Sequence, residues 1–169
     1  WTLTLENLTR RTRRISVFAY AHFQLTGVNA EGRWVGADNA SEVRRDIRGV
    51  FVRNRDRSVP NGRFNGCVVT LANYAGGSGY RDHFTRSDFS LGTPRILWGW
   101  NCDNLAGCGP DCAGVVQVKL MLPPKQTRRA DFLLGQAADV AEIKRVLKRL
   151  TPARLDAACA EQVKLEQKR

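Results

Sequence analysis

The strongest constraint on the fold is the stretch from Gly114 to Gln136. It contains two segments in which apolar and polar side chains alternate, the pattern of a strand with one buried face. A break at residues 123–127, which begins with two prolines, separates them. The apolar faces are Val116, Val118, Leu120 and Leu122 in the first segment and Ala130, Phe132 and Leu134 in the second. The pattern predicts a β-hairpin whose apolar face needs a second sheet to cover it.

The upstream chain can supply that second sheet. Residues 1–6 and 15–25 alternate in the same way, and we expect them to pair as a hairpin around a basic turn. The second of these segments is apolar or aromatic on both faces, as in strands that lie between stacked layers. Short apolar runs at 47–52 and 67–71 predict two further strands. The sequence therefore predicts a mainly β chain, an antiparallel two-sheet sandwich over residues 1–137.

Three segments lack a strand pattern and are predicted to be loops: 26–46, with a possible helical turn near 41–43, then 54–65, and the glycine-rich run 75–79. The glycine-rich run has neither the Lys-Ser/Thr of a phosphate-binding loop nor the G-x-G-x-x-G order of a dinucleotide-binding turn. We therefore interpret it as a flexible connection.

The last part of the chain, residues 138–169, is predicted to form two helices. Asp139 and Glu142 have capping-box spacing, and Thr151-Pro152 has the pattern of a second helix start. Each helix carries an apolar stripe and a basic outer face, so each needs a partner. That partner is either the sandwich or a further domain, and we interpret the segment as a helical linker.

Composition narrows the function classes. A chain of 169 residues fits one domain, and its formal charge is +11. The arginines and lysines are dispersed, and no nucleic-acid recognition motif accompanies them, so a nucleic-acid partner is not expected. No apolar run approaches the ~20 residues that span a bilayer, so no membrane contact is expected. A cytoplasmic location is the expectation.

The five cysteines do not form a recognisable framework. Cys102, Cys108 and Cys112 cluster in sequence, whereas Cys67 and Cys159 stand apart. A structural zinc site usually takes four ligands in closely spaced pairs, and a second pair is missing. A metal site and a disulfide remain alternatives, but free thiols are the favoured interpretation, with no metal and no cofactor expected.

The chemically richest stretch is Tyr80–Asn104. Aromatic rings there stand beside amide, carboxylate and guanidinium groups, the combination that a sugar-binding surface needs. The alternative is that Trp98 and Trp100 lie on one strand face and belong to the core. His83, near Asp82, could act as a general base, but no nucleophile pattern accompanies it. The candidate carbohydrate-binding residues are Tyr80, Arg81, Arg86, Trp98, Trp100, Asn101 and Asp103.

Several segments, in order along the chain, resemble the N-terminal β-sandwich of glycoside hydrolase family 94. This family includes cellobiose and cellodextrin phosphorylases and the C-terminal module of cyclic β-1,2-glucan synthases. The stretch ISVF at 15–18 is similar to the family's LSVF, and GVFVRN at 49–54 to a segment of the glucan-synthase module. Elsewhere the matching positions are Arg86, Phe89, Gly92, Asp111, Gln117, Pro123 and Phe132 to Gly135, and Lys125 stands where a Gly-Glu turn is usual.

The resemblance implies a galactose-mutarotase-like super-sandwich, followed by linker helices and an (α/α)6 barrel. In that family the barrel carries the catalytic Asp and most phosphate-binding groups, so we predict no catalytic residue within this chain. It also implies inorganic phosphate as co-substrate, a β-glucan oligosaccharide as ligand, and a homodimer in the parent protein.

The resulting hypothesis is a non-catalytic module of an inverting β-glucoside phosphorylase or a glucan-processing glycosyltransferase, inactive by itself. The alternatives are a stand-alone carbohydrate-binding sandwich and a polyanion-binding module driven by charge.

Overall fold

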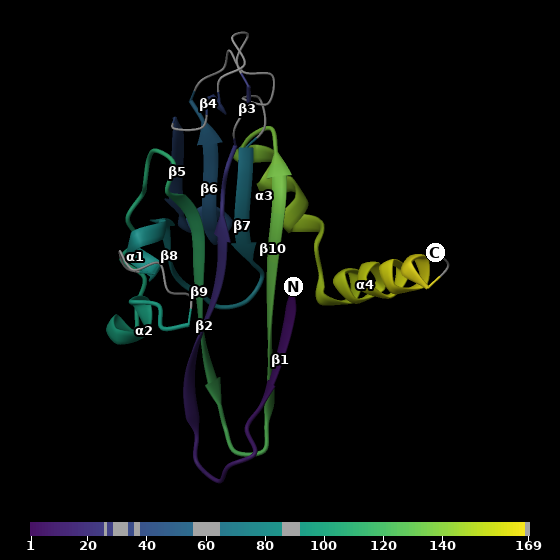
Figure 1. The fold of residues 1–169 in the computed structure, drawn as a ribbon. Helices are drawn as coiled ribbons and strands as arrows, with labels where there is room; N and C mark the ends of the chain where they lie inside the picture. The colour runs from purple at the N-terminus through teal and green to yellow at the C-terminus, as the bar shows by residue number, and fades with distance from the viewer. Residues whose placement is uncertain (26, 29–33, 36–37, 56–64, 86–91, 168–169) are drawn as a thin grey trace.

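The computed structural model describes residues 1–25, 27–28, 34–35, 38–55, 65–85 and 92–167. Two antiparallel sheets stack face to face, and short helices lie at the side and end of the stack (Figure 1). This confirms the predicted class, a mainly β two-sheet sandwich with C-terminal helices.

The larger sheet has five strands in the order β1-β10-β7-β6-β5. Its strand β10 is long enough to serve two neighbours. The first half of β10 pairs with β1 and the second half with β7. The strands are β1 (Thr2–Glu6), β5 (Asn39–Arg44), β6 (Gly49–Asn54), β7 (Asn65–Thr70) and β10 (Thr127–Ala137).

The smaller sheet has three strands in the order β2-β9-β8. Its central strand β9 pairs with β2 over ten residues, from His22 opposite Ala113 to Arg13 opposite Leu122. The strands are β2 (Arg13–His22), β8 (Tyr74–Tyr80) and β9 (Cys112–Leu122), and a separate short pair joins β3 (Gly27–Val28) to β4 (Trp34–Val35).

The predicted hairpin over 114–136 is wrong in its pairing, although both of its strands exist. β9 and β10 lie in different sheets, so the break between them is an arch across the sandwich. Their apolar faces meet in the core instead of lying side by side in one sheet. The core cluster contains Val116, Val118, Leu120, Leu122, Ala130 and Phe132. Leu134, predicted on the same face, is 53% exposed.

The first predicted hairpin fails for the same reason. β1 pairs with β10 and β2 with β9, so the basic turn between them is a second arch. Asn7, which is buried, ties the two arches together. Its Nδ2 donates to the carbonyl oxygens of Arg11, 2.8 Å away, and Leu122, 2.8 Å away. Its backbone N–H donates to the carbonyl oxygen of Gln126 at 3.0 Å.

Two of the predicted loops contain strands. Residues 39–44 form β5 at the edge of the large sheet, and the helical turn η1 (Arg45–Ile47) follows it. The glycine-rich run is part of β8, where glycine is required by close approach. A Cβ at Gly79 would lie 1.9 Å from Ser41 Oγ. The predicted loop 54–65 falls mostly outside the described residues.

The two C-terminal helices behave differently. α3 (Val140–Arg149) packs on the outer face of the large sheet, with Ile143 4% exposed. Its predicted cap is present, because Asp139 Oδ1 accepts from the N–H of Glu142 at 2.7 Å. α4 (Pro152–Glu166) has no buried residue and extends away from the sandwich (Figure 1). The described helices include none that is both long and apolar enough to cross a membrane.

Candidate functional site

The outer face of the three-stranded sheet is covered over only part of its length. Two short helices, α1 (Arg81–Thr85) and α2 (Ile96–Gly99), lie against one end of it. Phe84 of α1 stacks on Tyr20 of β2 with ring centroids 4.9 Å apart. Ile96 and Cys102 complete this small apolar cluster. Beyond it, the outward side chains of β2 and β9 become polar, and the cover stops.

Gln117 fixes the boundary between the covered and open parts. It lies on β9 and is 1% exposed, although it carries a polar amide. Its Nε2 donates to the Trp100 carbonyl oxygen at 2.7 Å and to Ser16 Oγ at 3.1 Å. Its Oε1 accepts from the backbone N–H of Cys102 at 3.0 Å. A buried amide with its groups satisfied in this way holds the loop after α2 at a fixed height above the sheet.

Trp98 and Trp100 are on the surface. They are 75% and 68% exposed, so the alternative that assigned them to a core strand is wrong. Trp98 lies in α2, and Trp100 is the residue that ends this helix. Trp100 has a φ of 62°, a left-handed conformation that is uncommon for a residue with a side chain. Its side chain borders the open part of the sheet.

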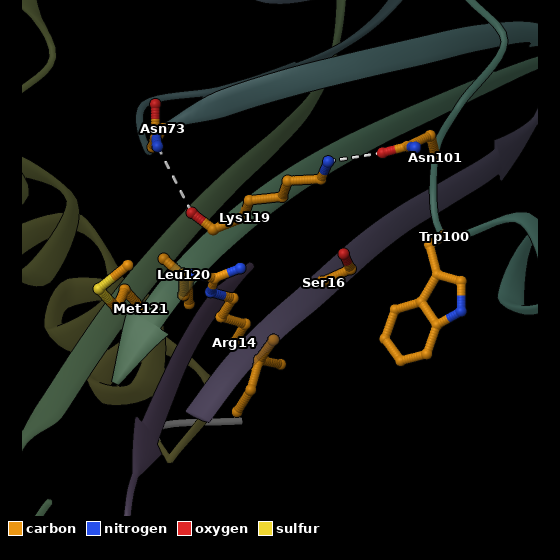
Figure 2. A pocket seen from close by; sticks show the side chains of 9 residues that line it. Arg14, Ser16, Asn73, Trp100, Asn101, Lys119, Leu120 and Met121 are labelled. Carbon is orange, nitrogen blue, oxygen red and sulfur yellow. Dashed lines mark hydrogen bonds between the residues drawn. The ribbon is translucent and has the colours of Figure 1, made fainter. Parts of the chain in front are cut away.

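A groove of about 450 Å³ lies on that open part. Figure 2 shows Trp100 at one side, Arg14 and Ser16 on β2, and Lys119 on the neighbouring strand β9. Lys119 Nζ donates to Asn101 Oδ1, and Asn73 Nδ2 lies 3.5 Å from the Lys119 carbonyl oxygen. The lining residues are Arg14, Ile15, Ser16, Asn73, Trp100, Asn101, Lys119, Leu120 and Met121.

The remaining predicted residues form a separate cluster around α1. His83 Nδ1 lies 2.9 Å from Asp103 Oδ2, and the Tyr80 ring meets the His83 ring edge-on with centroids 5.2 Å apart. Arg81 Nη1 lies 3.5 Å from an Asp111 carboxylate oxygen. These contacts fasten α1 to the following loop and to the start of β9. Of the candidate residues, only Trp100 and Asn101 line the groove, and Arg86 lies outside the described residues.

Comparison with known protein families shows to which family the chain belongs. A family model described as glycosyl hydrolase 94, supersandwich domain, matches residues 1–153. The chain belongs to this family. A search of curated proteins found no match.

Membership confirms the resemblance stated from the motifs, and it makes the chain a module of a carbohydrate-active family. The matched region includes both sheets, α1, α2 and α3, and it ends at Ala153 in the first turn of α4. The groove beside Trp100 therefore belongs to the supersandwich domain itself.

The cysteines of the supersandwich domain and of α4 are free thiols. Burial raises the pKa of Cys102 to about 12 and that of Cys112 to about 11. Both thiols are thus protonated and weakly nucleophilic near neutral pH. Among the described residues, no group of three or more His, Cys, Asp or Glu side chains could hold a metal ion.

Sequence reasoning missed seven of the nine described groove residues, four of them polar or charged, and the residue that supports the groove. The four polar or charged residues come from three separate parts of the chain, and none has a local motif: Arg14 and Ser16 of β2, Asn73, and Lys119 of β9. One feature of the sequence could have indicated the role of Gln117, because this residue interrupts a run of buried valines on β9. A polar amide at such a position usually has specific partners.

Proposed function

We propose that this chain is the non-catalytic sandwich module of a larger enzyme, an inverting β-glucoside phosphorylase or a glucan-processing glycosyltransferase. The observation that carries the proposal is the contrast between the matched domain and α4. The family match stops as α4 begins, yet α4 carries Leu155, Cys159 and Val163 along one stripe. A helix of this length without packing is marginal in water, so it favours a partner.

In this proposal residues 1–137 form the sandwich, and residues 138–169 link it to an (α/α)6 catalytic barrel. One contact restrains the direction of α4. Arg129 of β10 donates to both carboxylate oxygens of Asp156, at 2.7 and 3.0 Å, and to Asp131. The barrel would supply the acid that protonates the leaving oxygen while inorganic phosphate attacks the anomeric carbon with inversion. A homodimer and a cytoplasmic location complete the proposal for the parent protein.

Two experiments test this proposal. The isolated chain should release no glucose 1-phosphate from cellobiose, cellodextrins or sophorose with phosphate, and measurable turnover would contradict a non-catalytic role. The gene should continue in frame past Arg169 into a region that encodes a helical barrel. A stop codon directly after residue 169 would overturn the modular proposal.

A second candidate function is carbohydrate binding by the sandwich itself, for β-glucan oligosaccharides. The exposed indole of Trp100 lines the same groove as the amides of Asn73 and Asn101, and this combination supports carbohydrate binding. Isothermal titration with cello- and sophoro-oligosaccharides should give measurable heat, and Trp100→Ala should abolish it. Trp1→Ala is the matched control, because Trp1 is 62% exposed on the other sheet. Equal loss in both variants, or no heat with the unaltered chain, would contradict this second function.

A further inference from the structure

We propose that the groove beside Trp100 binds a saccharide that carries an anionic group, either a phosphate ester or a carboxylate. The inference deepens the second candidate function, carbohydrate binding by the sandwich, because it assigns a ligand class to the same surface. It also predicts that neutral sugars are the weaker ligands of this groove.

The groove carries two cationic side chains. Arg14 and Lys119 both line the groove, and its described lining contains no carboxylate. Other arginines of the domain do have carboxylate partners: Arg44 contacts Glu42 and Asp46, and Arg129 contacts Asp131 and Asp156. Within the part of the chain that the structure describes, no carboxylate lies in ion-pair contact with Arg14 or Lys119. Two such cations beside one groove create a positive potential that attracts an anionic group.

The indole of Trp100 is held in place before any ligand binds. The backbone of Trp100 is held on both sides, by the Gln117 bond to its carbonyl oxygen and by its own N–H, which donates to the Ile96 carbonyl oxygen at 3.1 Å. The residue keeps a left-handed φ of 62° in this setting. An uncommon backbone conformation that is fixed by hydrogen bonds on both sides and presents an exposed aromatic ring is a reason to suspect binding. Holding the ring in advance lowers the entropy cost of stacking a ligand on it.

The groove combines an aromatic ring with polar and cationic groups. An indole can cover the apolar face of a sugar ring, and Ser16, Asn73 and Asn101 offer hydroxyl and amide groups for its hydroxyls. A neutral sugar would use only this set, whereas an anionic sugar would also engage Arg14 and Lys119. The groove volume of about 450 Å³ lies in the range typical of small-ligand sites. The groove therefore suits one end or branch of a saccharide that bears a charge.

The test is isothermal titration of the chain, as it stands, with glucose 1-phosphate, glucuronate, glucose, inorganic phosphate and a short oligothymidylate. We expect glucose 1-phosphate or glucuronate to bind about tenfold or more tightly than glucose, as for hydrogen bonds to charged groups. The phosphate and carboxylate arms distinguish the two sources of negative charge. Trp100 fluorescence should change with the same ligands.

Matched variants localise the effect. Arg14→Gln and Lys119→Gln should each weaken the anionic sugars about tenfold and leave glucose unchanged. Trp100→Ala should weaken charged and neutral sugars alike. Arg128→Gln is the control, because it removes the same charge from an exposed position on the other sheet. Circular dichroism and the urea midpoint of each variant check that it folds.

Several results would overturn the inference. Equal affinity for glucose and glucose 1-phosphate would show that charge is not recognised. If Arg128→Gln weakened the binding of anionic sugars as much as Arg14→Gln or Lys119→Gln, the attraction would come from the overall positive charge of the protein and not from a localised site. If inorganic phosphate bound as tightly as glucose 1-phosphate, the sugar ring would not contribute to recognition. If the oligothymidylate bound more tightly than the anionic sugars, the groove would be a nucleic-acid surface. Binding of neutral cello-oligosaccharides without any gain from charge would defeat this inference alone, whereas no binding of any sugar would defeat the second candidate function as well.

Discussion

The outer faces of the two sheets differ in how far helices cover them. The outer face of the five-stranded sheet is apolar, and α3 covers it with Ile143 and Leu147 over Phe51 and Val69. The outer face of the three-stranded sheet is apolar at one end only, where α1 and α2 lie. Its other end is polar and open, and the groove lies there. A covered face stabilises the domain, and an uncovered polar face is available for a ligand.

The two covers are also attached by different forces. α3 is attached mainly by apolar burial, whose free energy is roughly proportional to the buried area. The loop after α2 depends on the hydrogen bonds of one buried side chain, Gln117. We therefore expect α3 to contribute more to stability and Gln117 to matter more for the position of Trp100. The following predictions test this comparison.

The largest expected effect is on thiol reactivity, because each cover hides one cysteine. Cys67 lies beneath α3, and Cys102, which belongs to the loop after α2, is buried in the apolar cluster with Phe84 and Val115. Cys108 and Cys159 are exposed. The raised pKa of Cys102, about 12, gives a thiolate fraction roughly a thousandfold below that of an ordinary thiol. Iodoacetamide at pH 8, followed by mass spectrometry, should label Cys108 and Cys159 first. If iodoacetamide labelled Cys102 as fast as Cys108 and Cys159, Cys102 would not be protected by the packing of its loop against the sheet.

The next effect is on the free energy of unfolding. Ile143→Ala leaves a cavity between α3 and the sheet and should cost about 2–4 kcal/mol, as for other buried Ile or Leu truncations. The urea midpoint measures the loss, and Cys67 should become reactive in parallel. Val146→Ala on the same helix is the control, since Val146 is 47% exposed, and it should cost less than about 1 kcal/mol. Equal losses would mean that α3 is not attached through Ile143.

Gln117→Leu should have a smaller effect on stability and a marked one on the groove. It leaves the Cys102 N–H and the Trp100 carbonyl oxygen without their partner, at a cost of about 1–3 kcal/mol. Trp fluorescence should shift as Trp100 moves, and Cys102 should label faster. Lys119→Gln on the same strand is the control and should change stability by less than about 0.5 kcal/mol. An unchanged emission spectrum in Gln117→Leu would contradict the positioning role.

The smallest effect concerns the ion pairs at the edge of the α3 cover. Asp46 accepts from Arg44 Nη2 at 2.9 Å and from Lys144 Nζ of α3 at 2.7 Å. Hydrogen bonds from Arg44 and then Lys144 hold the pKa of Asp46 well below its usual range. Because the folded-state pKa is depressed, the stabilisation is present above the unfolded value near 4 and is lost as the pH falls further.

Asp46→Asn should therefore cost less than about 1 kcal/mol at pH 7, as expected for exposed pairs. The difference from the unaltered chain should shrink as the pH falls from 4 toward 2, and urea midpoints measured at several pH values check it. A difference that stays constant over this range would show that the carboxylate charge is not involved.

The positions of most strands followed from the sequence. The alternation over 116–122 marks β9, and the capping spacing of Asp139 and Glu142 marks the start of α3. These features depend on residues within a few positions of one another, so local pattern suffices. β8 was missed because glycine runs usually indicate loops. Here Gly79 is required by the approach of Ser41, which lies 38 positions earlier in the chain.

The candidate site was predictable only in part. The aromatic and polar residues around Trp100 in the sequence indicated a sugar-binding surface. Of the predicted residues, Trp100 and Asn101 do line the groove. Tyr80, Arg81 and Asp103 have the same residue chemistry but hold α1 in place. The sequence could not separate the two groups, because residue type does not say which side chains already have partners within the fold.

The amino-acid sequence by itself determined most of the segments that form strands, which of their faces are apolar, where α3 and α4 begin, and to which family the chain belongs. Only the tertiary structure decided that β9 and β10 face each other across an arch, and that Arg14, Lys119 and Trp100 share one groove. A period of two residues tells which side of a strand is buried, but it is equally satisfied by a neighbour in the same sheet and by a strand in the opposite one. That choice depends on contacts between distant parts of the chain.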